Sequence, residues 1–349
     1  MNETSQRQLK EYLEKKLNLN VKENESMSKY TTLRVGGYAD LFVDVSDNNL
    51  FAEIYKKASE LKVPIFVFGG GSNILVGDKG IRGLVIRNSS SQIEIKDIVK
   101  SIKINKTDVP RKDSKLGLSS VWTDMKYEEE ISDGRKVMVS AGTALSALIH
   151  KTLKEKLTGL EWFTGIPGTI GGAVWNNIHG ADWFFGDFIS EVYTIDSRGQ
   201  KKVYKKEDLN LKYNHSDFQT KNEIIVSAEI ILPYGNISRA KATAEEWKKR
   251  KAFQPRNSAG STFSNLSEEV YKNAGLENGA AGFVIDKILN MRGYKIEGAS
   301  VFAEHGNFIV TDQNTTARNV KDLIELIQTK ALEKIGIELQ PEIVFVGEF

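Results

Sequence analysis

Two glycine-rich segments are the parts of this chain best suited to ligand chemistry. The first is Gly69-Gly70-Gly71-Ser72-Asn73, directly after an apolar run over 65–68. Glycines let the backbone approach a ligand closely, and successive amide N–H groups can form an anion site suited to a pyrophosphate. The spacing is neither that of a Rossmann fingerprint nor that of a P-loop, which needs Gly-Lys-Ser/Thr. Taken alone, the segment also fits a plain tight turn.

The second segment has small residues that would let a flat ring lie against the backbone. Its candidate ligand-binding residues are Gly165, Ile166, Pro167, Gly168, Thr169, Gly171, Gly172, Ala173 and Asn177. The structural alternative is a helix packed closely on a sheet through its glycines. Two such loops at strand ends together favour a dinucleotide or flavin site over a purely structural role.

Ser261 and Glu342 are candidate reactive side chains, each with an ordinary alternative. Ser261 lies in SAGSTFSN (258–265), where a serine is usually a turn residue, and the Gly-x-Ser-x-Gly motif of many hydrolases is missing. Glu342 follows Pro341 at the start of an apolar run, where a carboxylate is normally solvated. The spacing of the two residues does not place them side by side.

Composition excludes several classes of protein. The 349 residues suggest two or three domains, and 48 Lys and Arg against 46 Asp and Glu give a net charge of +2. We therefore expect no nucleic-acid or membrane partner. With no cysteine and only four histidines, not at ligand spacing, we expect no disulfide, no iron–sulfur cluster and no metal site. The N-terminal residues lack an apolar core and no apolar run reaches about 18 residues, so we expect neither a secretory signal nor a membrane span.

Periodicity and turn residues predict an α+β fold. We expect helices over 5–17, 47–62, 144–156, 238–252, 280–289 and 317–336. We expect strands over 39–45, 65–68, 83–88, 136–142, 191–196, 201–204, 223–232 and 342–347, and a turn followed by a strand within 305–311. The polar segment at about 89–133 is interpreted as an insertion with some β structure and no assigned function.

In their order along the chain, these segments resemble the UDP-N-acetylenolpyruvoylglucosamine reductase (MurB) family. The resemblance covers about 28–349 and rests on TTLRVGGYADLFV (31–43), FGGGSNILV (68–76), GLEWFTGIPGTIGGAVWNN (159–177), SAGSTFSN and LQPEIVFVG (339–347). It implies a two-lobed α+β FAD-binding region of the vanillyl-alcohol-oxidase type over 28–234. An N-terminal helical extension (1–27) precedes this region, and a C-terminal α+β substrate-binding domain (235–349) follows it.

The resemblance also implies an activity. The family uses FAD and NADPH to reduce UDP-N-acetylglucosamine enolpyruvate to UDP-N-acetylmuramate, a peptidoglycan precursor, in the bacterial cytoplasm. Segment 69–73 would hold the FAD pyrophosphate, and 165–173 with Asn177 would line the isoalloxazine. Flavin N5 would give hydride, Ser261 would give the proton, and Glu342 would help to polarise the substrate. Tyr213, Asn265 and Lys287 would bind substrate, and we expect a monomer of the shorter, type II-like form.

The chain departs from the family pattern at several positions. Asn214 stands where the family has an arginine that stabilises the enolate carboxylate, so either His215 or an arginine such as Arg292 supplies the charge, or turnover is weakened. His179 stands where a glycine is expected, and it would contact flavin or substrate or lie at the surface. Ser264 and Leu266 replace the family's usual lysine and proline beside Asn265. A flavin oxidase of the same fold and a non-catalytic nucleotide-sugar-binding homologue are the alternative functions.

Overall fold

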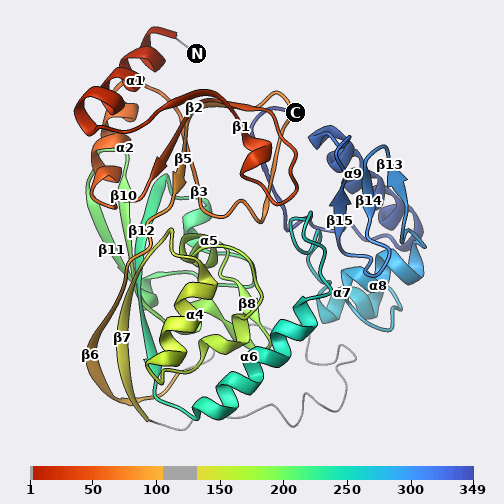
Figure 1. Cartoon of the computed structure of the whole chain (residues 1–349). Helices are drawn as coiled ribbons and strands as arrows, with labels where there is room; N and C mark the ends of the chain where they lie inside the picture. The colour runs from red at the N-terminus through yellow and green to blue at the C-terminus, as the bar shows by residue number, and fades with distance from the viewer. Residues whose placement is uncertain (1–2, 105–131) are drawn as a thin grey trace.

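The computed structural model describes residues 3–104 and 132–349. Their helices and strands form two lobes and a C-terminal domain (Figure 1), each with its own hydrophobic core. The α+β prediction is confirmed. The central part of the predicted insertion, 105–131, lies outside the described residues.

The first lobe is a mixed sheet covered by two helices. The sheet has the order β1-β2-β5-β3, in which β1 is antiparallel to β2, and β5 is parallel to both β2 and β3. The strands are β1 (Lys22–Ser26), β2 (Tyr38–Val45), β3 (Ile65–Phe68) and β5 (Ile81–Asn88), and the helices are α1 (Glu3–Leu17) and α2 (Leu50–Glu60). Leu9 and Leu13 of α1 share one core with Phe51 and Ile54 of α2. The predicted boundary at residue 27 falls just after β1, although α1 and β1 both belong to this lobe.

The second lobe is an antiparallel sheet in the order β11-β10-β12-β7-β6. Its strands are β6 (Ile93–Ile102), β7 (Ser132–Ser140), β10 (Ile189–Asp196), β11 (Lys201–Lys205) and β12 (Glu223–Pro233). The helices α4 (Leu145–Lys154) and α5 (Ile170–Trp175) and the hairpin of β8 (His179–Gly180) and β9 (Trp183–Phe184) lie on one face (Figure 1). β6 comes from the predicted insertion, and its charged residues suit an edge strand that faces solvent.

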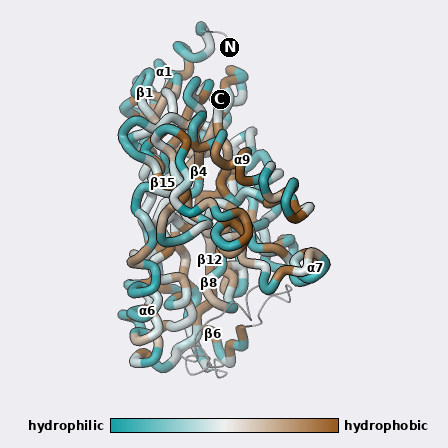
Figure 2. The backbone as a smooth tube through the Cα atoms, turned by 90° about the vertical axis from the view of Figure 1, so that its right-hand side faces the viewer, coloured by the Kyte–Doolittle hydropathy of each residue, from teal (hydrophilic) through white to brown (hydrophobic). Residues whose placement is uncertain are grey.

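The C-terminal domain follows α6 (Ile237–Lys251), which runs from the second lobe toward it (Figure 1). Its elements are α7 (Glu268–Asn273), α8 (Ala281–Phe283) continued by a π-helical turn (Val284–Ile288), β13 (Lys295–Ile296), β14 (Ala299–Val301), β15 (Ile309–Thr311) and α9 (Ala317–Ile335). Figure 2 shows mainly hydrophilic and neutral colours along α6. By contrast, α9 buries one apolar face, with Val320, Leu323 and Ile327 in the domain core. Gly336 ends α9 with φ 68°, as a C-terminal glycine does.

The last strand crosses back to the first lobe. β16 (Val344–Val346) pairs in parallel with β4 (Ile74–Val76), in the register Val344 with Ile74. β4 follows the first glycine segment directly. The end of the chain therefore lies beside the first glycine segment, although more than two hundred residues separate β16 from β4 in the sequence.

The main helices and strands are confirmed, and the differences concern short elements. β1 and β13 were not predicted, and the helix expected over 280–289 is partly π-helical. β1 reads KENES, a polar pattern that lacks the alternation of a half-buried strand. In the part of the chain that the structure describes, no helix has the length and apolarity to cross a membrane.

Candidate active site

The two glycine segments face one another. The Ser72 hydroxyl donates a hydrogen bond to the Pro167 carbonyl at 3.2 Å. A Cβ atom added at Gly70 would lie 3.3 Å from the Gly168 Cα, and one at Gly69 would lie 2.8 Å from Thr169 Cγ2. The close approach of the two backbones therefore requires small residues on both sides, which the sequence alone did not reveal.

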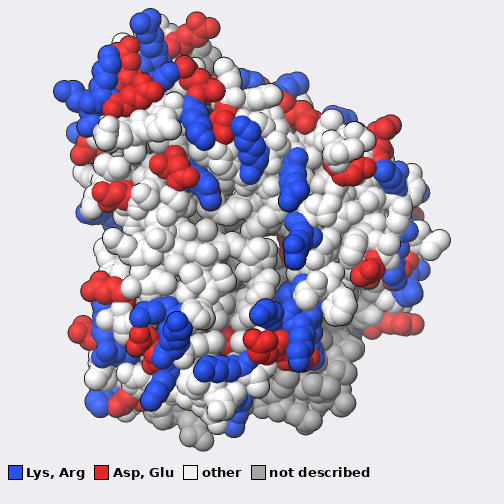
Figure 3. Space-filling model, in the orientation of Figure 1, with Lys and Arg blue, Asp and Glu red and all other residues white. Residues whose placement is uncertain are grey.

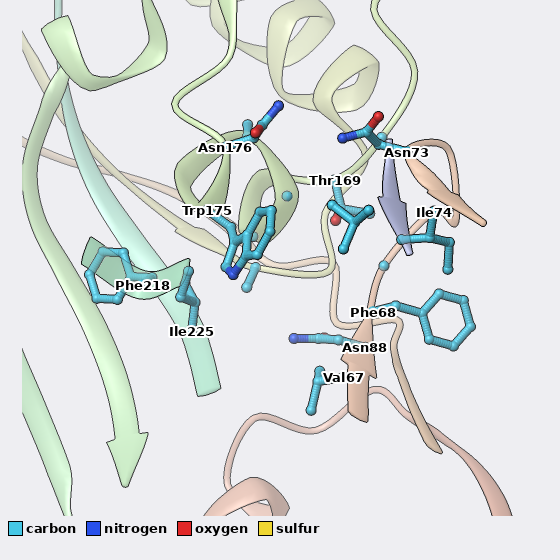
Figure 4. Close-up of a pocket in the computed structure, with 18 of the residues that line it drawn as sticks. Val67, Phe68, Asn73, Ile74, Asn88, Thr169, Trp175, Asn176, Phe218 and Ile225 are labelled. Atoms are coloured by element: carbon cyan, nitrogen blue, oxygen red, sulfur yellow. The ribbon is translucent and has the colours of Figure 1, made fainter. Parts of the chain in front are cut away.

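A cavity of about 530 Å³ lies between these segments. Figure 4 shows Thr169 and Trp175 near its centre, with Phe218 and Ile225 on one side and Phe68 and Ile74 on the other. The predicted ligand-binding residues that line it are Gly69, Gly70, Gly71, Ser72, Asn73, Pro167, Gly168, Thr169, Gly171, Gly172 and Ala173. Closely approached glycine backbone and flat apolar walls suit an aromatic dinucleotide.

Gly165, Ile166 and Asn177 are not among the lining residues, and two of them have other contacts. Gly165 packs on the side chain of Lys251, whose Cβ would lie 2.8 Å from a Cβ at Gly165. The buried Asn177 amide donates to the Lys212 carbonyl at 2.9 Å and accepts from the Gly186 N–H at 2.8 Å. Its neighbour Asn176 lines the cavity instead. A direct cofactor contact of Asn177 stays a prediction.

The return of the last strand brings Glu342 to the cavity and to Ser261. The Asn73 amide donates to the Glu342 carbonyl at 3.0 Å, and Val344 lines the cavity. The Glu342 N–H donates to the Thr262 carbonyl at 2.8 Å, so the two candidate reactive residues lie on adjacent backbone segments. Ser261 follows Gly260, which has φ 79° and no neighbouring atom within 4 Å of an added Cβ. The backbone just before the half-buried Ser261 therefore borders open space.

The Glu342 carboxylate accepts hydrogen bonds from a turn of the second lobe. Tyr213 donates to Oε1 through its hydroxyl at 3.3 Å, and the Asn214 side-chain amide donates to the same oxygen. Asn214 has φ 51°, a left-handed conformation that asparagine tolerates better than most residues. The position that departs from the family pattern is therefore in direct contact with the candidate catalytic glutamate.

Comparison with known proteins places this geometry in a family. The C-terminal domain model of UDP-N-acetylenolpyruvoylglucosamine reductase matches residues 253–346, and a FAD-binding domain model matches 114–202. The reductase of Caldanaerobacter subterraneus is 32% identical, over 93% of each chain. The reductase of Prochlorococcus marinus is also 32% identical, over 95% of this chain and 98% of its own. This chain belongs to the MurB family.

A solved MurB structure agrees with the observed architecture. MurB from Thermus caldophilus superposes with a TM-score of 0.68 at 26% identity, covering 94% of this chain and 99% of its own. Both lobes and the C-terminal domain therefore correspond to a MurB fold.

The other residues suggested by the MurB resemblance lie in the C-terminal domain or at its edge. Asn265 accepts the Ala281 N–H at 3.0 Å. The side chain of Lys287 is 65% exposed and lies 3.7 Å from Asp286. Arg292 bonds to the Ala303 carbonyl and to Asp286. Substrate contacts of Asn265 and Lys287 stay predictions.

Two histidines near the site are neutral at physiological pH. Burial lowers the pKa of His179 to about 4, with a further contribution from the charge of Lys251. The His179 ring lies 4.9 Å from the Tyr213 ring, so the histidine is part of the site wall. Burial and Lys251 also lower the pKa of His305. Neither imidazole carries the charge that Asn214 lacks.

Lys251 is a site residue that the sequence did not single out. Burial lowers the pKa of its ammonium group, while the Glu342 carboxylate raises it. The signal in the sequence was the run Lys248-Lys249-Arg250-Lys251, which looks like ordinary positive charge at a helix end.

Proposed function

We propose that this chain catalyses the FAD-dependent reduction of UDP-N-acetylglucosamine enolpyruvate to UDP-N-acetylmuramate with NADPH, in peptidoglycan precursor synthesis. The observation that carries the proposal is the return of β16, which sets Glu342 and the Ser261 segment beside the glycine-lined cavity. Membership in the MurB family supports the same reaction.

FAD is the cofactor, and the residues present suit it. Segment 69–73 would hold the pyrophosphate, and 165–173 would lie along the flavin ring. When bound, FAD supplies the hydride that it takes from NADPH. Figure 3 shows Lys and Arg side chains in a column down the middle of one face, between the lobes and the C-terminal domain, which suits the approach of anionic nucleotides.

The protein residues control charge and protons on the enolpyruvyl group. Hydride addition at the β-carbon builds negative charge at the α-carbon, which then takes a proton. A serine hydroxyl is a weak acid, yet a strongly basic carbanion can still be protonated by it, and the backbone at Gly260, next to Ser261, borders open space. Glu342 would orient and polarise the substrate carboxylate, because Tyr213 and Asn214 fix its own carboxyl group.

The proposal includes the expected organisation of the chain: an FAD-binding region over 28–234, a substrate domain over 235–349, and a monomer in the bacterial cytoplasm without nucleic-acid or membrane partners. The flavin oxidase alternative predicts flavin that stays with the protein after acid precipitation, with His179 as the only histidine of the flavin-lining motif. Flavin released by acid excludes that tether.

A two-step anaerobic assay tests the reaction. NADPH should bleach the visible flavin band, and UDP-N-acetylglucosamine enolpyruvate should restore it. In Ser261→Ala, NADPH should still bleach the band, but recovery should slow by about 10²-fold or more. The control is Ser300→Ala, which removes a half-buried hydroxyl from β14 of the same domain. A wild-type band that bleaches and never recovers with substrate would contradict the proposal.

A further inference from the structure

The side chain of Lys251 lies where three parts of the chain meet. Lys251 is the last residue of α6, which leads from the second lobe to the C-terminal domain (Figure 1). Its charge acts on His179 of the second lobe, on His305 of the C-terminal domain and on Glu342 near the chain end. Lys251 therefore lies within electrostatic range of Glu342, the candidate reactive carboxylate.

The burial of Lys251 is not explained by its place at a helix end. Cations in the last turn of a helix are favourable, and the exposed Lys248 and Lys249 fill that role without leaving water. Lys251 instead packs its Cβ and Cγ against Gly165, where an added Cβ would lie 2.8 and 3.0 Å from these atoms. Glycine at position 165 thus makes room for the lysine stem beside the second glycine segment.

The positive charge of Lys251 lacks a close counter-charge. In residues 3–104 and 132–349, no carboxylate oxygen lies within ion-pair distance of its ammonium group. The half-buried ammonium group does lie over the Trp247 ring of its own helix, 5.9 Å from the ring centroid. Withdrawing a cation from water without an ion pair still costs free energy, and the lowered pKa of Lys251 reflects this cost. Such groups are often retained because a ligand uses them.

Other cations suggested by the sequence have partners of their own. Arg292 bonds to Asp286 and to the Ala303 carbonyl, and the exposed Lys287 lies beside the same aspartate. Asn214 gives its amide to Glu342. The substrate would bring a second carboxylate next to Glu342, and two adjacent carboxylates repel each other unless a cation or a shared proton compensates.

We propose that the Lys251 ammonium group binds the enolpyruvyl carboxylate of the substrate and supplies the positive charge that Asn214 does not. This rests on the proposed function. The developing negative charge of the reaction is delocalised onto that carboxylate, so the ion pair would strengthen as hydride is transferred. Lys251 would then contribute more to turnover than to ground-state binding.

Lys251→Met tests the assignment, because methionine keeps the apolar stem and removes the charge. Binding of two ligands to the oxidised holoenzyme is compared: UDP-N-acetylglucosamine enolpyruvate, and UDP-N-acetylglucosamine, which lacks the carboxylate. We expect the enolpyruvyl ligand to bind about 10-fold more weakly or worse and the carboxylate-free ligand to bind as before. Equal weakening of both would assign Lys251 to the diphosphate and overturn the proposal, as would no weakening of either.

Turnover provides a second readout. Reoxidation of reduced flavin by substrate should slow about 10- to 100-fold in Lys251→Met, while flavin reduction by NADPH stays unchanged. Lys251→Arg should keep most of the rate, and Asn214→Arg should restore part of the rate lost in Lys251→Met. Lys249→Met removes an exposed charge from the same helix turn and should match wild type. If Asn214→Arg restores none of the rate lost in Lys251→Met, the proposal that Lys251 supplies the positive charge missing at position 214 is contradicted.

The stability of the variants separates this role from a structural one. The ammonium group of Lys251 is half-buried and has no ion pair, so its removal should leave the thermal midpoint of Lys251→Met equal to wild type or higher. A lower midpoint, together with reduced FAD content, would mean that Lys251 supports the fold and would overturn the proposal. If wild type itself binds no enolpyruvyl substrate, the proposed function fails first and the Lys251 assignment fails with it.

Discussion

Replacing Gly69 by alanine tests whether the close contact of the two glycine segments builds the FAD site. The new Cβ would lie 2.8 Å from Cγ2 and 2.9 Å from Cβ of Thr169, with Thr169 Oγ1 closer still. Because carbon atoms in contact prefer about 3.5–4.0 Å, Thr169 must retreat by roughly 1 Å. Such overpacking costs about 1–3 kcal/mol.

This cost should weaken FAD binding, because Gly69 and Thr169 both line the cavity. If the whole cost weakens FAD binding, the Kd rises about 5- to 150-fold. FAD content after gel filtration and the Kd for FAD of the apoprotein measure the effect. Gly70→Ala is the matched control, since the three atoms nearest to its Cβ would be Gly168 backbone atoms at 3.3–3.9 Å, and it should weaken FAD binding less.

A second substitution at the contact should reverse the effect. Thr169 is the N-cap of α5 but makes no side-chain capping bond, so Thr169→Gly should cost little by itself. The double variant Gly69→Ala/Thr169→Gly should therefore recover FAD affinity. If Gly69→Ala binds FAD as tightly as wild type, or if the double variant shows no recovery, the packing argument is refuted.

Three further predictions follow from the structure. Glu342→Gln should leave flavin reduction by NADPH intact and slow flavin reoxidation by substrate by about 10²-fold or more. Equal slowing of both steps would contradict the role of Glu342 in polarising the substrate. Burial lowers the pKa of His179 in the folded chain to about 4, below its ordinary value of 6.5, so the unfolded chain takes the proton first as pH falls. Stability should therefore drop between these pH values by up to about 3 kcal/mol, and His179→Gln should flatten the pH dependence of denaturant midpoints. Leu13→Ala should lower the free energy of unfolding by about 2–5 kcal/mol, because Leu13 of α1 lies in the hydrophobic core of the first lobe. A loss near zero would show that α1 is not needed for the stability of this lobe.

Much of the fold was readable because its signals are local. The amphipathic pattern over 317–336 and the stop at Gly336 predicted α9. Strands such as β2 and β12 have apolar runs bounded by turn residues. The polar β1 could not be predicted, because it is stabilised by pairing with β2 rather than by its own pattern.

The candidate site was readable in part. The repeated small residues indicated that a backbone or a ligand comes close, and the structure shows the two glycine segments in contact. Trp175 and Asn176 lie within the quoted segment 159–177, but they were not among the predicted ligand-binding residues. Phe218 carries no motif and reaches the cavity from the turn at Asp217–Gln219, so nothing in the sequence indicated it.

The sequence by itself determined the residue types: glycines that permit close approach, a serine with an acidic hydroxyl proton, a carboxylate, and an asparagine in place of an arginine. Only the tertiary structure decided which of them meet. The parallel pairing of β16 with β4 brings Glu342 next to Asn73. The hydrogen bond from the Glu342 N–H to the Thr262 carbonyl brings Glu342 next to the Ser261 segment. The burial of Lys251 is likewise a property of the assembled fold, because desolvation depends on every element packed around the ammonium group and not on its neighbours in sequence.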